Sequence, residues 1–268
     1  MFGRYALPSD ELVTTLSPTI TASADDPDYP ATNLTDPNPA NPAKLTTTDG
    51  NWVFDFGAAV QAVAVALIYH NLDEGLSAVL EWNTTDSWGS PAGSQAITIP
   101  AWTEEPLDGS FSPWTEIAGT PSYRYWRLVV GDGSPNNSNL IFIGNVMLVG
   151  ALRQLDTDVR WGIEEREEFG LLEQETELGV EYVEVLGGKR RRFVGEMGLR
   201  DYEAAELISL YRSATGRAAR WLLIPDETVN DAWYVRFDDP GWSRMRTDPN
   251  FNTFPYAVRE CSRGVPWP

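Results

Sequence analysis

Few side chains of this 268-residue chain could do chemistry. His70 is the one histidine and Cys261 the one cysteine, which excludes a multi-histidine or cysteine-based metal centre and an internal disulfide. A Ser-His-acid triad would have to use His70, and no G-x-S-x-G nucleophile elbow is present. Among 39 acidic residues, carboxylate pairs at glycosidase spacing arise by chance. The sequence therefore assigns no catalytic residue and predicts a protein that is not an enzyme.

One histidine and three tryptophans are candidates for binding. His70 ends an apolar run and precedes Asn71, so its imidazole is expected to hydrogen-bond loop backbone, with ligand contact as the alternative. Trp88, Trp102 and Trp114 fall in or beside expected loops and strand ends. An exposed aromatic ring can stack on the apolar face of a sugar. These four residues are therefore the candidate glycan contacts; for the tryptophans the alternative is partial burial or subunit contact.

The one basic cluster is Lys189-Arg190-Arg191-Arg192. In a strand its side chains would alternate between two faces, so only two share a face. Such a small footprint favours pairing with acids of this chain or of a neighbour, such as the run from Glu164 to Glu177, over nucleic-acid binding. The cluster is a candidate assembly contact.

Charge and hydropathy narrow the choice of partners. The formal charge is −19, and residues 1–150 hold 17 acidic residues against four basic ones. This balance disfavours nucleic acid as the main partner; it reflects either simple solubility or a docking partner with a basic face. No run reaches the roughly 20 apolar residues of a membrane span, so we expect no membrane insertion. The first residues lack the apolar stretch of a signal peptide.

The elements that would position the tryptophans and His70 are short strands. From Asn51 to Gly150, β-branched and aromatic runs alternate with Gly, Pro, Asn and Asp clusters and show no helical period. This spacing predicts an all-β sandwich over residues 18–150, whose proline-rich part, 18–51, is an ordered loop. Residues 1–17 are expected to be an extended leader that could belong to the C-terminal domain. The expected strands are 52–56, 62–69, 77–83, 95–99, 114–117, 124–130 and 140–149.

A second, β-rich domain is expected over residues 151–268. Residues 180–194 have the strand, turn, strand pattern of a hairpin that turns at Gly187-Gly188. One α-helix is predicted over about 201–215. Its apolar face, which should pack on the C-terminal sheet, carries Leu207, Ile208 and Tyr211.

Short segments in a fixed order run through the first domain. They are Asp28 to Asp36, Trp52 to Gly57, Val63 to Tyr69 followed by His70-Asn71, Tyr123 to Leu128, and Ile143 to Leu148. In that order they resemble the discoidin-like (galactose-binding-like, F5/8 type C) jelly-roll β-sandwich, in the variant found in tail proteins of long-tailed bacteriophages. The resemblance implies a presentation and docking module. It also implies a structural calcium near Asn33 and Asp36, for which Asx turns are the alternative; no other cofactor is expected.

The order of elements in the second domain resembles the C-terminal halves of phage minor tail and tail-tip proteins, whose domains relate to the tail-tube β-barrel with one packed helix. Together the resemblances imply a structural component of a tail tip or baseplate, made in the host cytoplasm and located in the virion. Its partners would be other tail proteins and copies of itself in a ring or oligomer, with weak contact to host-surface glycan. Two alternatives stay open: a carbohydrate-binding module that primarily recognises host polysaccharide, and an enzyme that degrades it.

Overall fold

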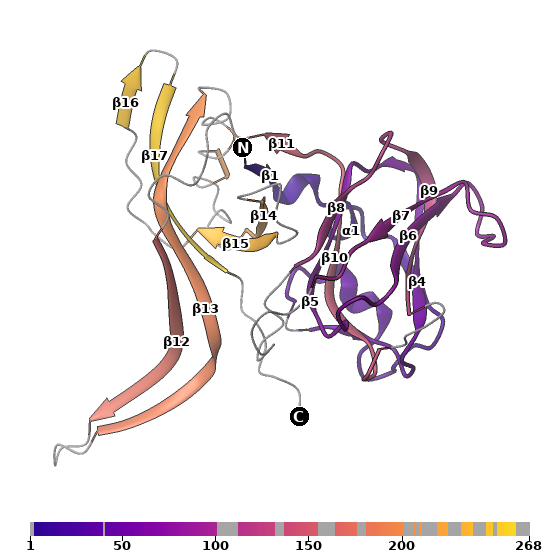
Figure 1. Ribbon diagram of the computed structural model, residues 1–268, viewed down its shortest axis with the longest axis horizontal. Coiled ribbons are helices and arrows are strands. Elements are labelled where there is room, and N and C mark those ends of the chain that lie inside the picture. The colour runs from indigo at the N-terminus through magenta and orange to yellow at the C-terminus, as the bar shows by residue number, and fades with distance from the viewer. Residues whose placement is uncertain are drawn as a thin grey trace.

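Strands dominate the computed structural model, as the sequence predicts, and form three antiparallel sheets (Figure 1). For residues 164–175, 181–200, 245–248 and 251–260 the structure describes the backbone alone. The described residues are 3–39, 41–100, 112–131, 137–154, 164–175, 181–200, 206, 209–210, 219–224, 232–237, 245–248 and 251–260.

The outer layer of the sandwich is a five-stranded sheet in the order β2–β4–β9–β6–β7. In β6 and β9, buried and half-exposed positions alternate, because successive side chains of a strand point to opposite faces. One face therefore enters the core, while the other leaves Tyr125 and Arg127 at the surface. The strands are β2 (Thr19–Ala22), β4 (Gly50–Gln61), β6 (Ala78–Asn83), β7 (Gly93–Ile97) and β9 (Ser122–Val130).

The inner layer is a four-stranded sheet in the order β3–β10–β5–β8. All residues of β5 are buried, and a strand covered on both faces needs apolar residues at consecutive positions, as Val65-Ala66-Leu67-Ile68 provides. The seven strands predicted between residues 52 and 149 are confirmed, with shifts at their ends. The inner strands are β3 (Ala43–Lys44), β5 (Ala64–His70), β8 (Trp114–Glu116) and β10 (Phe142–Val149).

The two layers meet in a common hydrophobic core, to which the five-stranded sheet contributes aromatic side chains and the inner sheet aliphatic ones. Trp52, Phe54 and Trp126 are at most 2% exposed. The rings of Trp82 and Trp126 lie 5.4 Å apart. A Cβ at Gly93 of β7 would lie only 2.6 Å from the Trp82 indole. Glycine at this position therefore leaves room for the ring. This core confirms the predicted β-sandwich.

A second hydrophobic cluster covers the opposite face of the inner sheet. There β5 and β10 pack against β14 (Trp221–Ile224) and β15 (Trp233–Phe237). The amide of Ala232 also donates to the carbonyl of Ser112, at 2.9 Å. The inner sheet is therefore the middle one of three layers. The cluster includes Ala64, Ala66, Ile68, Met147 and Val149 from the sandwich and Leu222, Ile224, Ala232 and Tyr234 from the third layer.

The N-terminal residues contact both parts of the molecule. β1 (Arg4–Ala6) pairs with β14 on one side and with β11 (Arg153–Gln154) on the other. The 3₁₀ turn η1 (Pro8–Asp10) and the short helix α1 (Leu12–Leu16) follow, and the amide of Gly150 donates to the Asp10 carbonyl at 2.8 Å. Another 3₁₀ turn, η2 (Ala31–Thr35), lies in the proline-rich segment.

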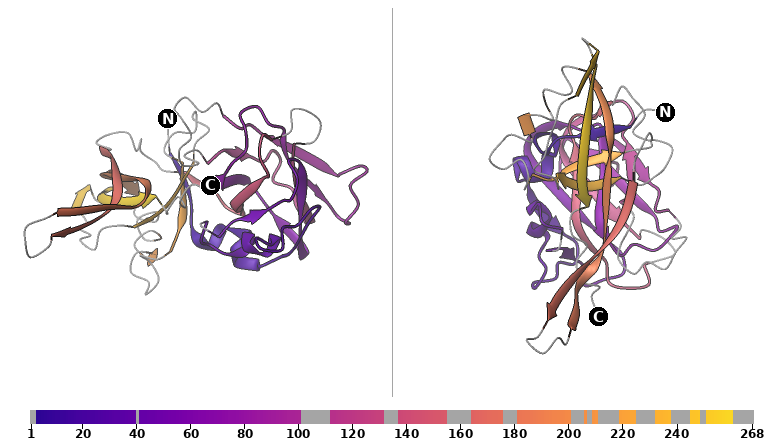
Figure 2. Two further views of the ribbon diagram at one scale, coloured as in Figure 1. Left: turned by 90° about the horizontal axis from the view of Figure 1, so that it is seen from below. Right: turned by 90° about the vertical axis from the view of Figure 1, so that its left-hand side faces the viewer.

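The third layer belongs to an eight-stranded sheet, ordered β11–β1–β14–β15–β17–β13–β12 with β16 on β17. Its long strands β12 (Glu164–Glu175) and β13 (Glu181–Arg200) form an arm that extends away from the sandwich (Figures 1 and 2). β16 is Met245–Asp248 and β17 is Phe251–Glu260. The end strands β11 and β12 do not pair with each other, so the described strands form an open sheet and the predicted tail-tube-like barrel is wrong for them.

The hairpin predicted to turn at Gly187-Gly188 is also wrong. β13 continues through both glycines and pairs with β12 along its length, with Gly187 opposite Gly170 at a register irregularity. Glycine permits a turn but does not require one, and inside a strand it often marks a bulge. The connection of the actual hairpin, residues 176–180, lies outside the described residues.

Most of the helix predicted over 201–215 lies outside the described residues. Glu206, Ser209 and Leu210 are described and are helical. The Glu206 carboxylate forms an ion pair with Arg153 of β11, with its Oε2 2.7 Å from the Arg153 Nε. The face predicted to pack on the sheet, with Leu207, Ile208 and Tyr211, is not among the described residues.

Candidate functional site

Trp88 lies in the loop between β6 and β7 and is half-buried. Its indole Nε1 donates to Asp86 Oδ1 at 2.7 Å, which fixes the ring within the loop. The guanidinium carbon of Arg127 stands 4.6 Å from the ring centroid, a cation–π contact. The half-buried indole is therefore held in one orientation at the surface.

Arg127 is itself held by a cross-strand partner. Glu81 of β6 lies directly opposite Arg127 of β9 in the sheet register. The Glu81 Oε2 accepts from Nε at 2.8 Å and from Nη2 at 2.5 Å. Both side chains are largely covered, at 17% and 19% exposure, so this pair is better shielded from solvent than an ordinary surface ion pair.

A second arginine of β9, Arg124, pairs with a carboxylate of β4. Arg124 donates to both oxygens of Asp55, at 2.7 and 2.8 Å, and lies 4.8 Å from the centroid of the Tyr125 ring. The hydrogen bonds from Arg124 lower the pKa of Asp55 to about 2. The same pairing raises the pKa of Arg124. Both members of the pair therefore stay charged through the physiological range.

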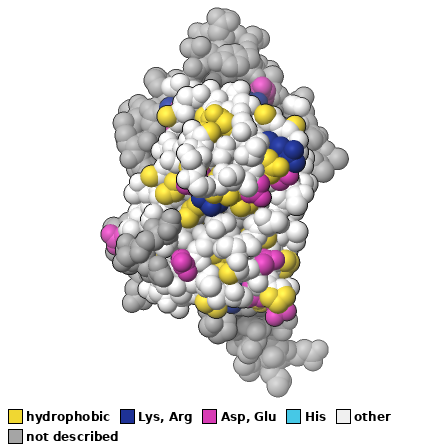
Figure 3. Space-filling model, turned by 90° about the vertical axis from the view of Figure 1, so that its right-hand side faces the viewer, with side chains coloured by type: hydrophobic (Ala, Val, Ile, Leu, Met, Phe, Trp, Pro, Cys, Tyr) yellow, Lys and Arg dark blue, Asp and Glu magenta, His cyan; other side chains and the backbone are white. Residues whose placement is uncertain are grey.

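Together these residues form what we call the arginine–aromatic face, on the outer surface of the five-stranded sheet. It comprises Asp55, Glu81, Trp88, Arg124, Tyr125 and Arg127. Basic, acidic and hydrophobic side chains lie close together on this side of the molecule (Figure 3). Aromatic rings offer apolar stacking area, and charged pairs offer strong donors and acceptors for hydroxyl groups. The chemistry of the face is that of polar recognition, with rigid side chains.

His70, predicted as a glycan contact, is buried at 2% exposure. Its Nδ1 accepts from the amide of Leu72 at 3.1 Å, a bond to loop backbone of the kind that the sequence predicts. A ligand at the surface does not reach a side chain buried to this degree. The burial of His70 therefore disfavours the alternative of ligand contact, which stays a prediction.

The other two predicted tryptophans do not join Trp88. Trp114 is 9% exposed and packs in the cluster between the sandwich and β14–β15, which fits the alternative of burial. Trp102 lies outside the described residues. Of the predicted glycan contacts, Trp88 alone is described in a half-exposed position.

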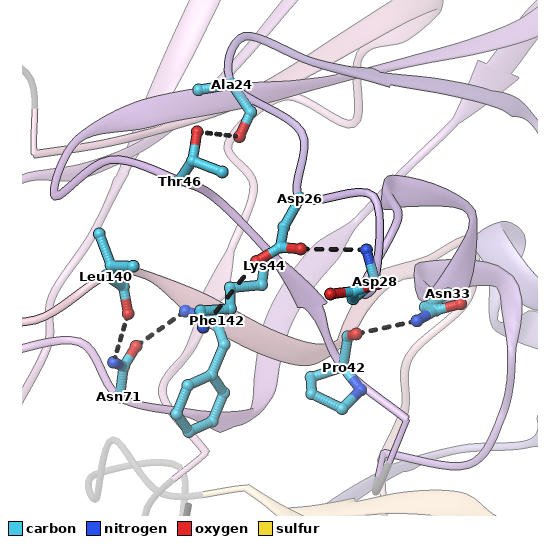
Figure 4. A network of polar contacts seen from close by, with 10 residues as sticks. All are labelled: Ala24, Asp26, Asp28, Asn33, Pro42, Lys44, Thr46, Asn71, Leu140 and Phe142. Atoms are coloured by element: carbon cyan, nitrogen blue, oxygen red, sulfur yellow. Dashed lines mark hydrogen bonds and ion pairs between the residues drawn. The ribbon is translucent and has the colours of Figure 1, made fainter.

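Asparagines organise the loops at one end of the sandwich. The Asn71 side chain donates to the Leu140 carbonyl at 2.8 Å and accepts from the Phe142 amide at 2.9 Å (Figure 4). Asn137, 3% exposed, donates to the carbonyls of Asn71 and Asn139 and accepts from the Asp73 amide. Sequence reasoning missed this network; the cluster of asparagines after Gly131 was its only signal. Its bonds end within the protein, which indicates a structural role.

Asn33 and Asp36, predicted near a calcium ion, bond to their own loop. The Asn33 Nδ2 donates to the Pro42 carbonyl at 3.0 Å (Figure 4). The Asp36 oxygens accept from the Asn38 amide at 2.8 Å and from the Asn41 side chain at 3.3 Å. No group of three or more acidic, histidine or cysteine side chains suited to a metal occurs in the described part. The arrangement fits the Asx-turn alternative, and calcium binding stays a prediction.

The basic cluster Lys189 to Arg192 lies in β13, opposite the acidic strand β12. In register, Arg190 faces Glu168 and Arg191 faces Glu167. The acidic run that the sequence offers as a partner is therefore the neighbouring strand of the same hairpin. Whether the cluster also contacts a second subunit stays a prediction.

None of the helices in the described ranges has the length and apolar character needed to cross a membrane.

No protein-family model and no curated protein matches the sequence. Among solved structures, a fucose-binding module of Streptococcus pneumoniae is similar, at 9% identity and a TM-score of 0.38, covering 52% of this chain and 97% of its own. Chitosan-binding module 1 of a Paenibacillus sp. IK-5 chitosanase/glucanase covers 55% and 99%, at 14% identity and TM-score 0.38. The lectin domain of lectinolysin, complexed with Lewis B antigen, covers 50% and 93%, at 12% and 0.37.

These three neighbours are carbohydrate-binding proteins by name, and the resemblance to phage tail proteins stays a prediction. Identities and scores at this level do not establish a family or a ligand for this chain. The chain's own sheets, with their pairing and shared core, are what establish it as a mainly β protein built on a β-sandwich.

Proposed function

We propose that this chain is a carbohydrate-binding protein without catalytic activity, which recognises surface polysaccharide through the arginine–aromatic face. The observation that carries the proposal is the Trp88 indole, fixed by Asp86 and by the guanidinium of Arg127. An aromatic ring held in this way loses little conformational entropy on stacking against a sugar, and the nearby charged pairs can bond its hydroxyls. This is the alternative that the sequence left open, and the geometry of the face supports it best.

A glycan array, followed by calorimetric titration of the full chain with the polysaccharide that binds best, tests the proposal. Trp88→Ala should weaken binding about tenfold, the loss expected for one stacked ring. Tyr29→Ala is the matched control, because Tyr29 is also a half-buried aromatic beneath a cation, Lys44, but lies away from the face. Absence of saturable binding to any glycan, or equal binding by the Trp88 variant, would overturn the proposal.

A second candidate function is assembly, as a structural protein of a phage tail tip or baseplate in the virion. The observation that favours it is the β12–β13 arm, because a long strand at the edge of a sheet offers unpaired backbone groups to another chain. In this reading the arm contacts copies of the chain or neighbouring tail proteins, and the sandwich projects from the assembly.

Charge exchange within the arm separates assembly contacts from internal ones. Arg190→Glu places two glutamates opposite each other at Glu168, and like charges in register destabilise a strand pair. Adding Glu168→Arg restores the opposition of charges within the hairpin. If Arg190 makes a contact between subunits, the wild type should form oligomers. The single variant and the exchanged pair should both have the mass of a monomer by light scattering. Recovery of oligomers in the exchanged pair, or a monomeric wild type, would contradict that role.

A further inference from the structure

A cavity of about 480 Å³ lies where the sandwich meets the eight-stranded sheet. Its walls come from η1 and α1, from the loop that follows η2, and from the segment leading into β14 together with β15. Met147 of β10 also lines it. This volume is within the range of about 300 to 1,000 Å³ that is usual for small-molecule sites, and such sites often form at junctions between structural units. We call it the junction cavity.

The α1 wall is rigid because Glu11 anchors it. Glu11 is 3% exposed, and its two carboxylate oxygens accept from the amides of Val13 at 2.8 Å and Thr14 at 2.6 Å. The Thr15 hydroxyl donates to the Pro8 carbonyl at 3.2 Å. Because the Thr15 hydroxyl donates its proton to Pro8, its oxygen keeps acceptor capacity for a ligand in the cavity.

The opposite wall is tied together by Arg220 and Tyr234. Arg220 donates to the Pro37 carbonyl and, at 3.4 Å, to the Asn38 side chain. The Tyr234 hydroxyl donates to the same Pro37 carbonyl at 3.2 Å. A guanidinium carries five N–H donors, so two bonds to the loop leave others that can reach a ligand. The bonds to Pro37 also hold this wall in place without a ligand.

The lining indicates what kind of molecule would fit. Its described ionisable side chains are one carboxyl group, Glu11, and one guanidinium, Arg220. Most of its other polar groups are hydroxyls, and a hydroxyl both donates and accepts, as the hydroxyls of a sugar do. Prolines and Met147 supply apolar surface for the C–H groups of a ring. We propose that the junction cavity binds a neutral, hydroxyl-rich small molecule of mono- or disaccharide size.

This site is separate from the arginine–aromatic face, so each can be tested without the other. The probes are glucose, galactose, mannose, fucose and N-acetylglucosamine, with inorganic phosphate as the anionic comparison, titrated into the full chain by ligand-observed NMR. Thr15→Trp introduces an indole at an exposed position on the cavity wall. Thr19→Trp is the matched control, an exposed threonine of β2 outside the cavity. Thr35→Tyr, on the other wall, serves if the first variant does not fold.

At least one neutral sugar should bind saturably to the wild type, and Thr15→Trp or Thr35→Tyr should weaken it about tenfold or more. Thr19→Trp should bind as the wild type does. Binding of no sugar, binding of phosphate alone, or equal binding by the cavity variants would overturn the proposal. If Trp88→Ala lost sugar binding and the cavity variants kept it, the junction-cavity proposal would also be overturned. That result would support binding at the arginine–aromatic face.

Discussion

Two carboxylates, Glu11 of the N-terminal segment and Asp55 of the sandwich, carry opposite pKa shifts, and their surroundings explain both. Burial raises the pKa of Glu11 to about 7, because loss of hydration outweighs the bonds from the amides of Thr14, Val13 and Leu148. Asp55 lies at the surface, where the bonds from Arg124 lower its pKa to about 2. The charge of Glu11 therefore changes near neutrality, while Asp55 stays ionised in any neutral solution.

Glu11 should make the stability of the chain depend on pH. In the unfolded chain it ionises near its ordinary value of 4.5, and in the folded chain near 7. Between these values the unfolded state loses its proton first, so the free energy of unfolding should fall with rising pH, by about 3 kcal/mol, and level off above pH 7. Urea unfolding at a series of pH values measures this dependence.

Glu11→Gln should remove this fall, because a glutamine side chain has no proton to lose. Glu74→Gln, which removes an exposed carboxylate, is the matched control. Parallel curves for the wild type and Glu11→Gln would show that Glu11 is not the group responsible.

At the scale of elements, β10 holds the sandwich together. It pairs with β3 and β5, and it packs against η2 and α1. Gly144 lets the loop after η2 approach the strand, because a Cβ there would fall on the Pro39 carbonyl oxygen and 3.0 Å from the Pro39 Cα. The neighbouring side chain Asn145, fully buried, donates to the Asp36 carbonyl at 3.3 Å. The loop and the strand thus pack through backbone contacts that leave no space for a larger residue.

Gly144→Ala should therefore destabilise the protein by about 1 to 3 kcal/mol, the usual cost of overpacking a core, because backbone atoms cannot turn aside as a side chain can. Gly89→Ala is the matched control, since nothing lies within 4 Å of a Cβ at that position. Denaturant midpoints of the two variants give the comparison. Equal midpoints would mean that the loop moves away from β10 at little cost.

At the scale of the whole molecule, the sandwich shares its inner sheet with the C-terminal part. The cluster on the far face of β5 and β10 closes only when β14 and β15 are present. Residues 18–150 by themselves would leave that apolar face uncovered. Exposed apolar area of this kind promotes association, and its burial is a main source of stability.

A fragment of residues 18–150 should therefore have a lower free energy of unfolding than the full chain and should bind a hydrophobic dye. Light scattering should also show concentration-dependent association. The full chain measured under the same conditions is the control. A fragment that stays monomeric, binds no dye and unfolds cooperatively at the midpoint of the full chain would show that the sandwich does not need its third layer.

The sequence by itself determined the sandwich strands and one residue of the arginine–aromatic face. Alternation in β6 and β9 and the apolar run of β5 are local patterns, set by which face of a strand meets the core. Trp88 stood out as an aromatic in a loop. Its partner Arg127 was visible as a strand residue, but the stacking of the two depends on where the β6–β7 loop folds over the sheet.

Only the tertiary structure decided what covers the second face of the inner sheet, and with it the burial of Trp114. β1 pairs with β14, with Arg4 opposite Ile224, and Arg220 reaches the carbonyl of Pro37. Contacts between segments so far apart leave no periodic trace in either segment. The same holds for Gly187-Gly188. These glycines favour a turn locally, but the pairing of β12 with β13 continues through them. Short-range patterns fix the elements, but long-range packing chooses which faces are buried and so which side chains can bind.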